Sequence, residues 1–227
     1  MMKKITFISD THAKHTELNL PGGDILLFAG DCMTTGNNEN QLIWFLNWFS
    51  TQKYETKIFI AGNHDRFIQN NPKRFYEILD NYPDLIYLQD DYTMVDGITI
   101  YGSPWQPEFY NWAFNLPRGG NKLRKIWNKI PKNTDILITH GPPKGHLDVS
   151  GPPWHEPNLG CFLLRQRIDE IKPKIHVFGH IHGSYGYKEN LGTHIINASV
   201  MGEDYQCNHD IITCEWDNET NEINFLN

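Results

Sequence analysis

Five apolar runs of this sequence are each followed, within a few positions, by side chains that bind metal ions. These side chains are two aspartates, one asparagine and five histidines: Asp10, His12, Asp31, Asn63, His64, His140, His180 and His182. Neutral imidazole is the commonest metal ligand in proteins, and carboxylate and amide oxygens bind the harder divalent ions. The set suits Mn²⁺, Fe, Zn²⁺ or Ni²⁺, and also admits Mg²⁺, whereas an iron–sulfur cluster would require cysteines.

The number of candidate ligands favours two ions over one. A catalytic ion typically takes three protein ligands and leaves a position for water. Seven ligands are too many for one ion and about right for two ions that share a carboxylate. Paired ions roughly 3.5–4 Å apart are usual in enzymes that hydrolyse phosphoesters. We therefore predict a centre of two divalent metal ions, with Mn²⁺ as the first candidate.

The apolar runs that precede these side chains have the composition of buried strands. They are short and lack a polar face, and they cover residues 4–9, 25–29, 57–61, 135–139 and 174–178. In open α/β sheets, ligands bind beyond the carboxyl ends of the strands, so the five polar clusters are expected to converge on one crevice. Gly179 and Gly183 free the backbone of the last cluster, so that both of its histidines can face one centre.

Helices and further strands account for most of the remaining chain. The spacing of apolar residues predicts helices over 38–50, 72–82, 122–129 and 158–172. Further strands are predicted over 85–88, 92–95, 98–102, 193–198, 211–216 and 222–226. Asp96-Gly97 is a hairpin signal in a chain that otherwise alternates strand and helix, which indicates mixed sheets. Because no repeat or linker interrupts the sequence, we expect one domain over 1–227.

Composition and charge limit the class of protein. The chain has 227 residues, of which 39% are hydrophobic, enough for a sizeable core. Its net charge of −7 argues against a surface for long nucleic acid but not against a small phosphate-bearing substrate held by metal ions. No stretch approaches a membrane span, and the first apolar run ends at Asp10, too early for a signal peptide. We therefore expect no membrane partner and a cytoplasmic location.

The order and spacing of the polar clusters resemble those of a known superfamily. Between residues 10 and 182 the motifs Asp-x-His, Gly-Asp, Gly-Asn-His-Asp, a single His and Gly-His-x-His follow one another. This combination resembles the calcineurin-like metallophosphoesterases. A closer resemblance, over nearly the whole chain, is to the metallophosphoesterase-domain-containing (MPPED-type) cyclic-nucleotide phosphodiesterases, through segments such as SDTH, GGDILLFAGD, IAGNHD, YGSPWQPEF, DILITHGPPKGHLD and FGHIHGSYG. It implies a single-domain α/β sandwich of two mixed β-sheets flanked by helices.

The resemblance also implies a role for each matching residue. The first metal would be held by Asp10, His12 and His182. The second metal would be held by Asn63, His140 and His180. Asp31 would bridge the two ions, His64 would lie outside their coordination near the leaving group, and Asp65 would orient His64.

Two positions separate this chain from some relatives. Thr34 stands where some superfamily members have a tyrosine three residues after the bridging aspartate, so tyrosinate–iron chemistry is not expected. Some members of the MPPED-type branch lack the final histidine, which weakens catalysis. His182 is present here, so we expect an active enzyme.

Two segments without a clear period, 103–120 and 145–157, are expected to determine specificity. Their aromatic residues offer flat faces to a base: Trp105, Phe109, Trp112, Phe114 and Trp154. Their polar candidates for phosphate or ribose are Asn115, Arg118 and His146. The predicted substrate contacts are Asn63, His64, Trp105, Asn115 and Arg118. The alternative is that the aromatic residues only pack these loops against the body of the fold.

These observations predict a dinuclear metal-dependent phosphodiesterase for small phosphodiesters, with cyclic nucleotides as the first candidates. A hydroxide between the metals would attack phosphorus, and His64 would protonate the leaving oxygen. One alternative is a phosphomonoesterase or a nuclease on the same centre. Another is a non-catalytic nucleotide-binding module in which metals only hold phosphate, although such a module would need neither His64 nor His182.

Overall fold

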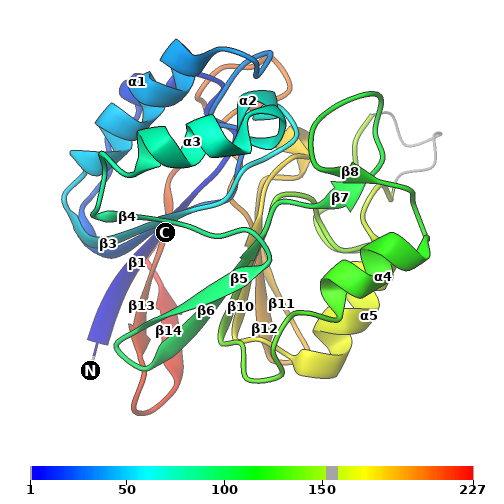
Figure 1. The fold of residues 1–227 in the computed structure, drawn as a ribbon. Coiled ribbons are helices and arrows are strands. Elements are labelled where there is room, and N and C mark those ends of the chain that lie inside the picture. The colour runs from blue at the N-terminus through cyan, green and yellow to red at the C-terminus, as the bar shows by residue number, and fades with distance from the viewer. Residues whose placement is uncertain (1, 152–157, 227) are drawn as a thin grey trace.

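Two six-stranded β-sheets, covered by helices on their outer faces, make up the computed structural model, which describes residues 2–151 and 158–226 (Figure 1). The first sheet has the order β14 (Glu222–Phe225), β13 (Ile212–Asp217), β1 (Met2–Ile8), β2 (Gly23–Phe28), β3 (Tyr54–Phe59) and β4 (Leu85–Tyr87). The second has the order β11 (Gly186–Asn190), β12 (Thr193–Asn197), β10 (Ile175–Phe178), β9 (Ile136–Thr139), β6 (Ile98–Ser103) and β5 (Asp91–Val95).

Both sheets are mixed. Strands β1 to β4 run parallel to one another, and β13 joins β1 in the antiparallel direction. In the second sheet β12, β10, β9 and β6 are parallel, whereas β11 and β5 are antiparallel edge strands. The predicted class, an α/β sandwich of two mixed sheets flanked by helices, is therefore confirmed.

The helices lie in two groups on opposite sides of the molecule (Figure 1). The first group consists of α1 (Glu39–Ser50), α2 (Arg66–Asn70) and α3 (Pro72–Leu79). The second consists of α4 (Asn121–Trp127) and α5 (Phe162–Ile171). No helix within the described ranges is long and apolar enough to cross a membrane.

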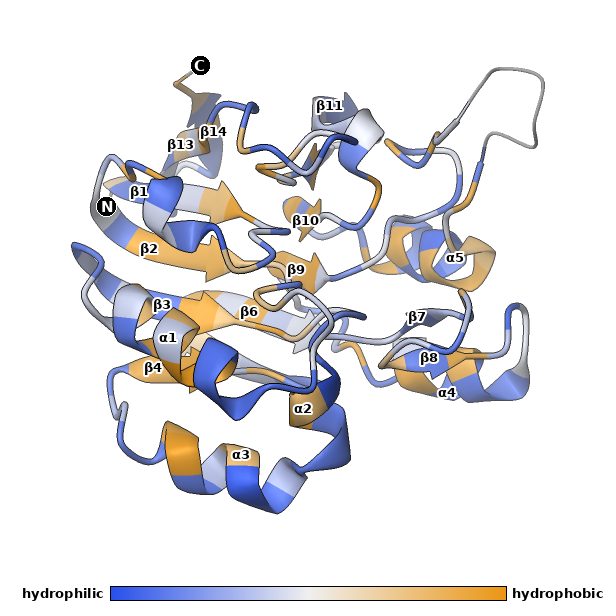
Figure 2. Cartoon of the chain, turned by 90° about the horizontal axis from the view of Figure 1, so that it is seen from above, coloured by the Kyte–Doolittle hydropathy of each residue, from blue (hydrophilic) through white to orange (hydrophobic). Residues whose placement is uncertain are grey.

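Alternating side chains along the strands build separate cores on the two faces of each sheet. Ile25 and Leu27 of β2 face the second sheet, whereas Leu26 and Phe28 pack towards α1. A third core lies where α4 and α5 cover the second sheet around Leu137. In Figure 2 the strands accordingly carry most of the apolar colour. Each parallel strand is thus fixed on both faces, which holds its carboxyl end firmly in place.

Most of the predicted helices form with short shifts at their ends. Asn38 caps α1, since its side chain accepts hydrogen bonds from the backbone N–H of Asn40 and Gln41. Helix α5 begins at Phe162 instead of residue 158, because the preceding residues pair with the loop after β9 through a bridge between Pro143 and Cys161. The sequence did not predict α2, which has only five residues, or β11, an edge strand without an apolar face. It also did not predict the two-residue strands β7 (Gln106–Pro107) and β8 (Asn115–Leu116), which pair with each other in a separate small sheet.

His15 is buried among aromatic side chains without a hydrogen-bond partner for either ring nitrogen. Its ring centroid lies 4.4 Å from that of Trp44 and 5.1 Å from that of Trp48. Burial disfavours the imidazolium and lowers the pKa of His15 to about 4.

We expect His15 to make the protein sensitive to mild acid. The unfolded chain binds a proton here near pH 6.5, whereas the folded chain does so only near pH 4, so stability falls as the pH drops between these values. Between pH 7 and pH 5 the loss is about 2 kcal/mol. Urea unfolding of wild-type and His15→Phe protein at both pH values checks this. An equal loss in the two proteins would contradict the assignment to His15.

Candidate metal centre

The predicted ligands converge where the carboxyl ends of five strands meet. Strands β1, β2 and β3 are neighbours in one sheet, and β9 and β10 are neighbours in the other. The side chains that follow them form three overlapping groups whose ligand atoms lie within 4.8 Å of one another: Asp10, His12 and His182; His12, Asp31 and His64; and Asp31, His140 and His180. The clustering predicted from the strand ends is therefore present.

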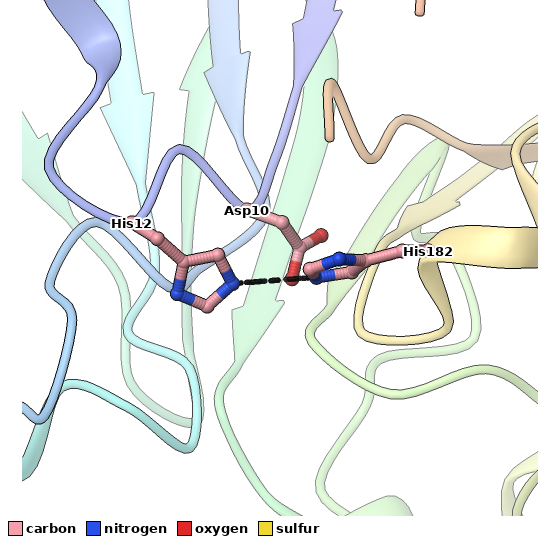
Figure 3. A group of neighbouring side chains, drawn as sticks. All are labelled: Asp10, His12 and His182. Carbon is pink, nitrogen blue, oxygen red and sulfur yellow. Dashed lines mark hydrogen bonds and ion pairs between the residues drawn. The ribbon is translucent and has the colours of Figure 1, made fainter. Parts of the chain in front are cut away.

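The first group could hold one ion. Asp10 Oδ1 lies 3.5 Å from His182 Nε2 and 4.0 Å from His12 Nε2, and the two imidazole nitrogens are 3.3 Å apart. The three side chains point towards one another from the two sides of the crevice (Figure 3). Ligand atoms bonded to one ion at about 2.0–2.2 Å are roughly 3–4.4 Å apart, so these separations fit a shared ion.

A second set of ligand atoms lies beside the first and shares Asp31 with it. His140 Nε2 is 3.2 Å from Asp31 Oδ2 and 2.9 Å from the amide oxygen of Asn63. The same Asp31 oxygen is 3.9 Å from His12 Nε2 in the first group. One carboxylate therefore lies between both sets, in the position that a bridging ligand between two ions requires.

Three of the histidines predicted to bind the metals are oriented by backbone carbonyl groups. In each, Nδ1 lies within hydrogen-bond distance of a carbonyl oxygen: His12 with Met33 at 3.1 Å, His140 with Ala29 at 2.9 Å, and His182 with Gly202 at 3.1 Å. A carbonyl only accepts, so Nδ1 carries the proton and the lone pair of the neutral ring is on Nε2. These rings thus present Nε2 to the centre as a ligand.

The electrostatics of the cluster favour cations. Burial raises the pKa of Asp31, but the neighbouring His140 and His64 outweigh this effect and hold the pKa well below its usual range. Burial likewise raises the pKa of Asp10, and the adjacent His182 ring, which donates to Asp10 when it is protonated, more than reverses the change. Burial lowers the pKa of His180 to about 3. Both carboxylates are thus ionised and His180 is neutral, as metal ligands must be.

His140 behaves differently from His180. Burial lowers the pKa of His140, but the adjacent Asp31 carboxylate raises it to about 9. The proton on Nε2 of the charged ring then points at Asp31 and the Asn63 oxygen. A metal ion bound by all three groups would take the place of this proton. Binding of the ion displaces that proton, so metal affinity is expected to rise with pH.

The backbone of the ligand loops is strained and closely packed. Asp10, Asp31 and His180 have left-handed φ angles of 56°, 62° and 68°. Such conformations cost about 1–3 kcal/mol each and persist where function requires them. A Cβ atom on Gly62 would overlap the Asp31 carboxylate, and one on Gly179 would overlap that of Asp10. Only glycine lets these loops approach so closely.

His64 is held against the cluster by the residues around its ring. Its Nδ1 donates a short hydrogen bond to the carbonyl oxygen of Thr34. One face of the ring stacks on Trp112, with centroids 4.1 Å apart and planes inclined by 25°. The guanidinium of Arg66 lies 4.6 Å from the centroid of the Trp112 ring. With Nδ1 occupied, Nε2 is free to exchange a proton with a bound substrate.

The role predicted for Asp65 is wrong in one respect. Its buried carboxylate does not orient the His64 ring, which the Thr34 carbonyl does instead. The Asp65 oxygens accept hydrogen bonds from the backbone N–H groups of Asp31, Cys32, Met33 and Gly62. Burial, aided by the Asp31 charge, raises the pKa of Asp65 to about 6, against the effect of these donors. Asp65 therefore joins the loops that carry Asp31 and Asn63.

We expect Asp65→Asn to destabilise the protein by about 2–3 kcal/mol. The amide turns one acceptor into a donor and leaves buried backbone N–H groups without a partner. Asp84→Asn is a matched control, because Asp84 is exposed. Urea unfolding of both variants measures the effect. If Asp65→Asn were as stable as the control, the carboxylate would not be holding these loops.

A cavity of about 400 Å³ opens onto the cluster. Asp31, Asn63, His64, His180 and His182 form its inner wall. Its outer wall includes two of the predicted loop residues, Phe109 and Arg118, together with residues that the sequence did not single out: Gln106, Glu203 and Tyr205. Glu203 and Tyr205 lie on a turn after β12 that matches no recognised motif, so only the fold brings them to the site.

The other predicted substrate contacts have structural roles. Trp105 donates from Nε1 to Asp90 and packs on Phe114, and it does not line the cavity. Asn115 donates to the carbonyl oxygens of Phe109 and Tyr110 and so shapes the loop. For Trp105 the packing alternative therefore holds, and the Asn115 amide is engaged within its own loop.

Of the remaining loop candidates, Phe114 and His146 also lie away from the cavity. Phe114 is buried in the core around α1. His146 contacts Arg165. Trp154 lies outside the described residues. Arg118 faces the cavity while two of its nitrogens donate to the carbonyl oxygens of Gly160 and Leu159, which fixes its guanidinium at the rim.

Known proteins are similar to this chain in sequence. The human protein named Metallophosphoesterase domain-containing protein 1 is 40% identical over 220 residues, which cover 88% of this chain and 66% of the human one. The Caenorhabditis elegans UPF0046 protein T07D4.2 is 37% identical over 224 residues, which cover 86% of this chain and 55% of that one. The chain thus spans between about half and two thirds of the length of these relatives.

Solved structures share the fold at low sequence identity. The protein TT1561 of Thermus thermophilus superimposes with a TM-score of 0.63 at 14% identity and covers 100% of this chain and 99% of its own. A 5′-nucleotidase precursor from the same organism gives a TM-score of 0.53 at 12% identity and covers 100% of this chain and 53% of its own.

The family is shown by a match to a family model. Residues 3–184, which include all the strand-end ligands, match the model of the family described as Calcineurin-like phosphoesterase. The resemblance to the metallophosphoesterase-domain-containing proteins is confirmed by the 40% identity to the human relative. With this match, and with the ligand side chains gathered at the ends of five strands, the chain belongs to the calcineurin-like phosphoesterase family.

Proposed function

We propose that the protein is a phosphodiesterase that uses two divalent ions, with Mn²⁺ as the first candidate, to hydrolyse small phosphodiesters, cyclic nucleotides first among them. The observation that carries this proposal is the position of Asp31, whose carboxylate lies within ligand distance of both histidine groups. Asp10, His12 and His182 would hold one ion. Asn63, His140 and His180 would hold the other. When bound, the ions would supply Lewis acidity and lower the pKa of water.

Side chains of the protein would bind the phosphate group and protonate the leaving oxygen. The Asn63 side chain and the guanidinium of Arg118 face the same cavity and can bind the non-bridging oxygens of a phosphate. His64 Nε2, left free by the bond from Nδ1 to Thr34, would donate a proton to the leaving oxygen. The ring of Trp112 keeps His64 from turning away from the cluster.

Parallel assays of a diester and a monoester test this proposal. Protein stripped with a chelator and refilled with Mn²⁺ is given bis-p-nitrophenyl phosphate or p-nitrophenyl phosphate, with His182→Ala as the control. We expect faster turnover of the diester, loss of activity on stripping and a large loss in the variant. Equal or faster turnover of the monoester would favour a phosphomonoesterase. No turnover of either, despite bound metal, would favour a nucleotide-binding module.

A further inference from the structure

A second cavity, of about 370 Å³, also borders the metal cluster. His12 and His64 form the part of its wall that belongs to the cluster. The rest of the wall is formed by Lys14, Thr34, Thr35, Met201, Tyr205 and Gln206. The ligands are therefore approached by two separate spaces, each large enough for an organic group.

Tyr205 stands between the two spaces. It lines both cavities, as His64 also does. The centroid of the Tyr205 ring lies 5.1 Å from that of His12 and also 5.1 Å from that of His182. The ring thus lies next to two histidines of the first metal group, at the border of the cavity lined by His180 and the cavity lined by Thr35.

The turn that carries Tyr205 is built to hold it there. Tyr205 has a left-handed φ of 57°, and its N–H donates to the carbonyl oxygen of Gly202 at 3.0 Å. The amino group of Lys14 donates to the Tyr205 carbonyl oxygen at 2.9 Å and to Gln206 Oε1 at 2.8 Å. These contacts hold the backbone of the turn, and so the position from which the Tyr205 side chain starts, in place beside the cluster.

The second cavity suits an uncharged organic group. Met201 is buried beneath it, and Tyr205 and Thr35 offer aromatic and small side chains to its wall. Among the described residues that line it, Lys14 carries the only lysine or arginine charge, and its amino group is engaged with the turn. A phosphate group is therefore expected at the cluster and not in this cavity.

We propose that the two cavities receive the two organic groups of an acyclic phosphodiester, one on each side of Tyr205. This inference rests on the proposed phosphodiesterase activity and extends it to diesters of two separate alcohols. Water would add its oxygen to phosphorus as one P–O ester bond breaks. The leaving alkoxide takes up a proton, so the products are a phosphomonoester, an alcohol and a released proton. A cyclic nucleotide, with both ester oxygens on one sugar, fills only one cavity.

A matched pair of substrates tests the partition: thymidylyl-(3′→5′)-thymidine as the acyclic diester and 3′,5′-cyclic thymidine monophosphate as the cyclic one. Thr35→Trp narrows the second cavity and Tyr205→Ala removes the partition, whereas Tyr205→Phe keeps the ring. Thr35 and Tyr205 are exposed, so these variants are expected to fold. We expect the ratio of kcat/KM for the acyclic over the cyclic diester to fall about tenfold in the first two variants, mainly through KM, and to stay unchanged in Tyr205→Phe.

The outcomes separate this inference from the function on which it rests. If wild-type protein hydrolysed only the cyclic diester, the two-cavity proposal would be overturned, whereas the proposed phosphodiesterase function would still stand. The two-cavity proposal would also be overturned if Thr35→Trp and Tyr205→Ala changed kcat/KM for both diesters by equal factors. No hydrolysis of either diester by the metal-loaded wild type would contradict the proposed function itself.

Discussion

His64→Ala is expected to slow hydrolysis of an alkyl-leaving diester by about 10²–10⁴-fold, the usual contribution of general acid catalysis. The imidazole is the group placed to protonate the leaving oxygen, because Nδ1 is bound to Thr34 and Nε2 is free at the cluster. A p-nitrophenolate leaving group needs little protonation. The same variant should therefore lose much less activity, about tenfold or less, with bis-p-nitrophenyl phosphate.

Rates for the two leaving groups in wild-type and His64→Ala protein of equal metal content measure this difference. Trp112→Phe is a suitable comparison, because it keeps an aromatic face against the His64 ring. It should retain most of the activity with both substrates. An equal loss with both leaving groups in His64→Ala would show that His64 supports the metals or the fold instead of acting as the acid.

Asp31→Asn is expected to abolish binding of at least one ion and to reduce diester hydrolysis more than about 100-fold. Removing a group that only orients a metal ligand typically costs 10–100-fold in metal affinity, and a direct ligand costs more. Asp31 approaches both His12 and His140, so its loss affects both ion positions. The amide also removes the negative charge that opposes repulsion between two cations.

Asp10→Asn provides the contrast, because Asp10 belongs to one group only. We expect it to retain the ion at Asn63, His140 and His180 and to lose the other. Metal content after dialysis against limiting Mn²⁺ distinguishes the variants. If Asp31→Asn kept two ions per chain, Asp31 would not be the bridging ligand.

The strand ends could be predicted from sequence because a strand that is buried on both faces consists almost entirely of apolar residues. Runs such as Ile25–Ala29 lack a polar face, and a polar side chain at their end is conspicuous. Parallel strands place their carboxyl ends at the same edge of the sheet, independently of the conformation of the connecting loops. For this reason the grouping of Asp10, Asp31 and His140 could be predicted without coordinates.

The surroundings of the cluster could not be predicted, because they depend on how loops pack. Trp112 looked like a platform for a base and stacks on His64 instead. Asp65 looked like a partner of the neighbouring ring, but the turn after β3 directs it to the backbone of the Asp31 loop. Tyr205 lies far along the chain on a turn with no motif, and only the meeting of the two sheets brings it to the site.

Measurement of metal content and activity in the same samples tests the central claim most directly. Protein stripped with a chelator is titrated with Mn²⁺, and bound metal per chain and hydrolysis of bis-p-nitrophenyl phosphate are followed together. We predict two ions per chain, with activity that rises fully only as the second ion binds. Saturation at one ion per chain, or turnover that persists without metal, would contradict a dinuclear centre bridged by Asp31.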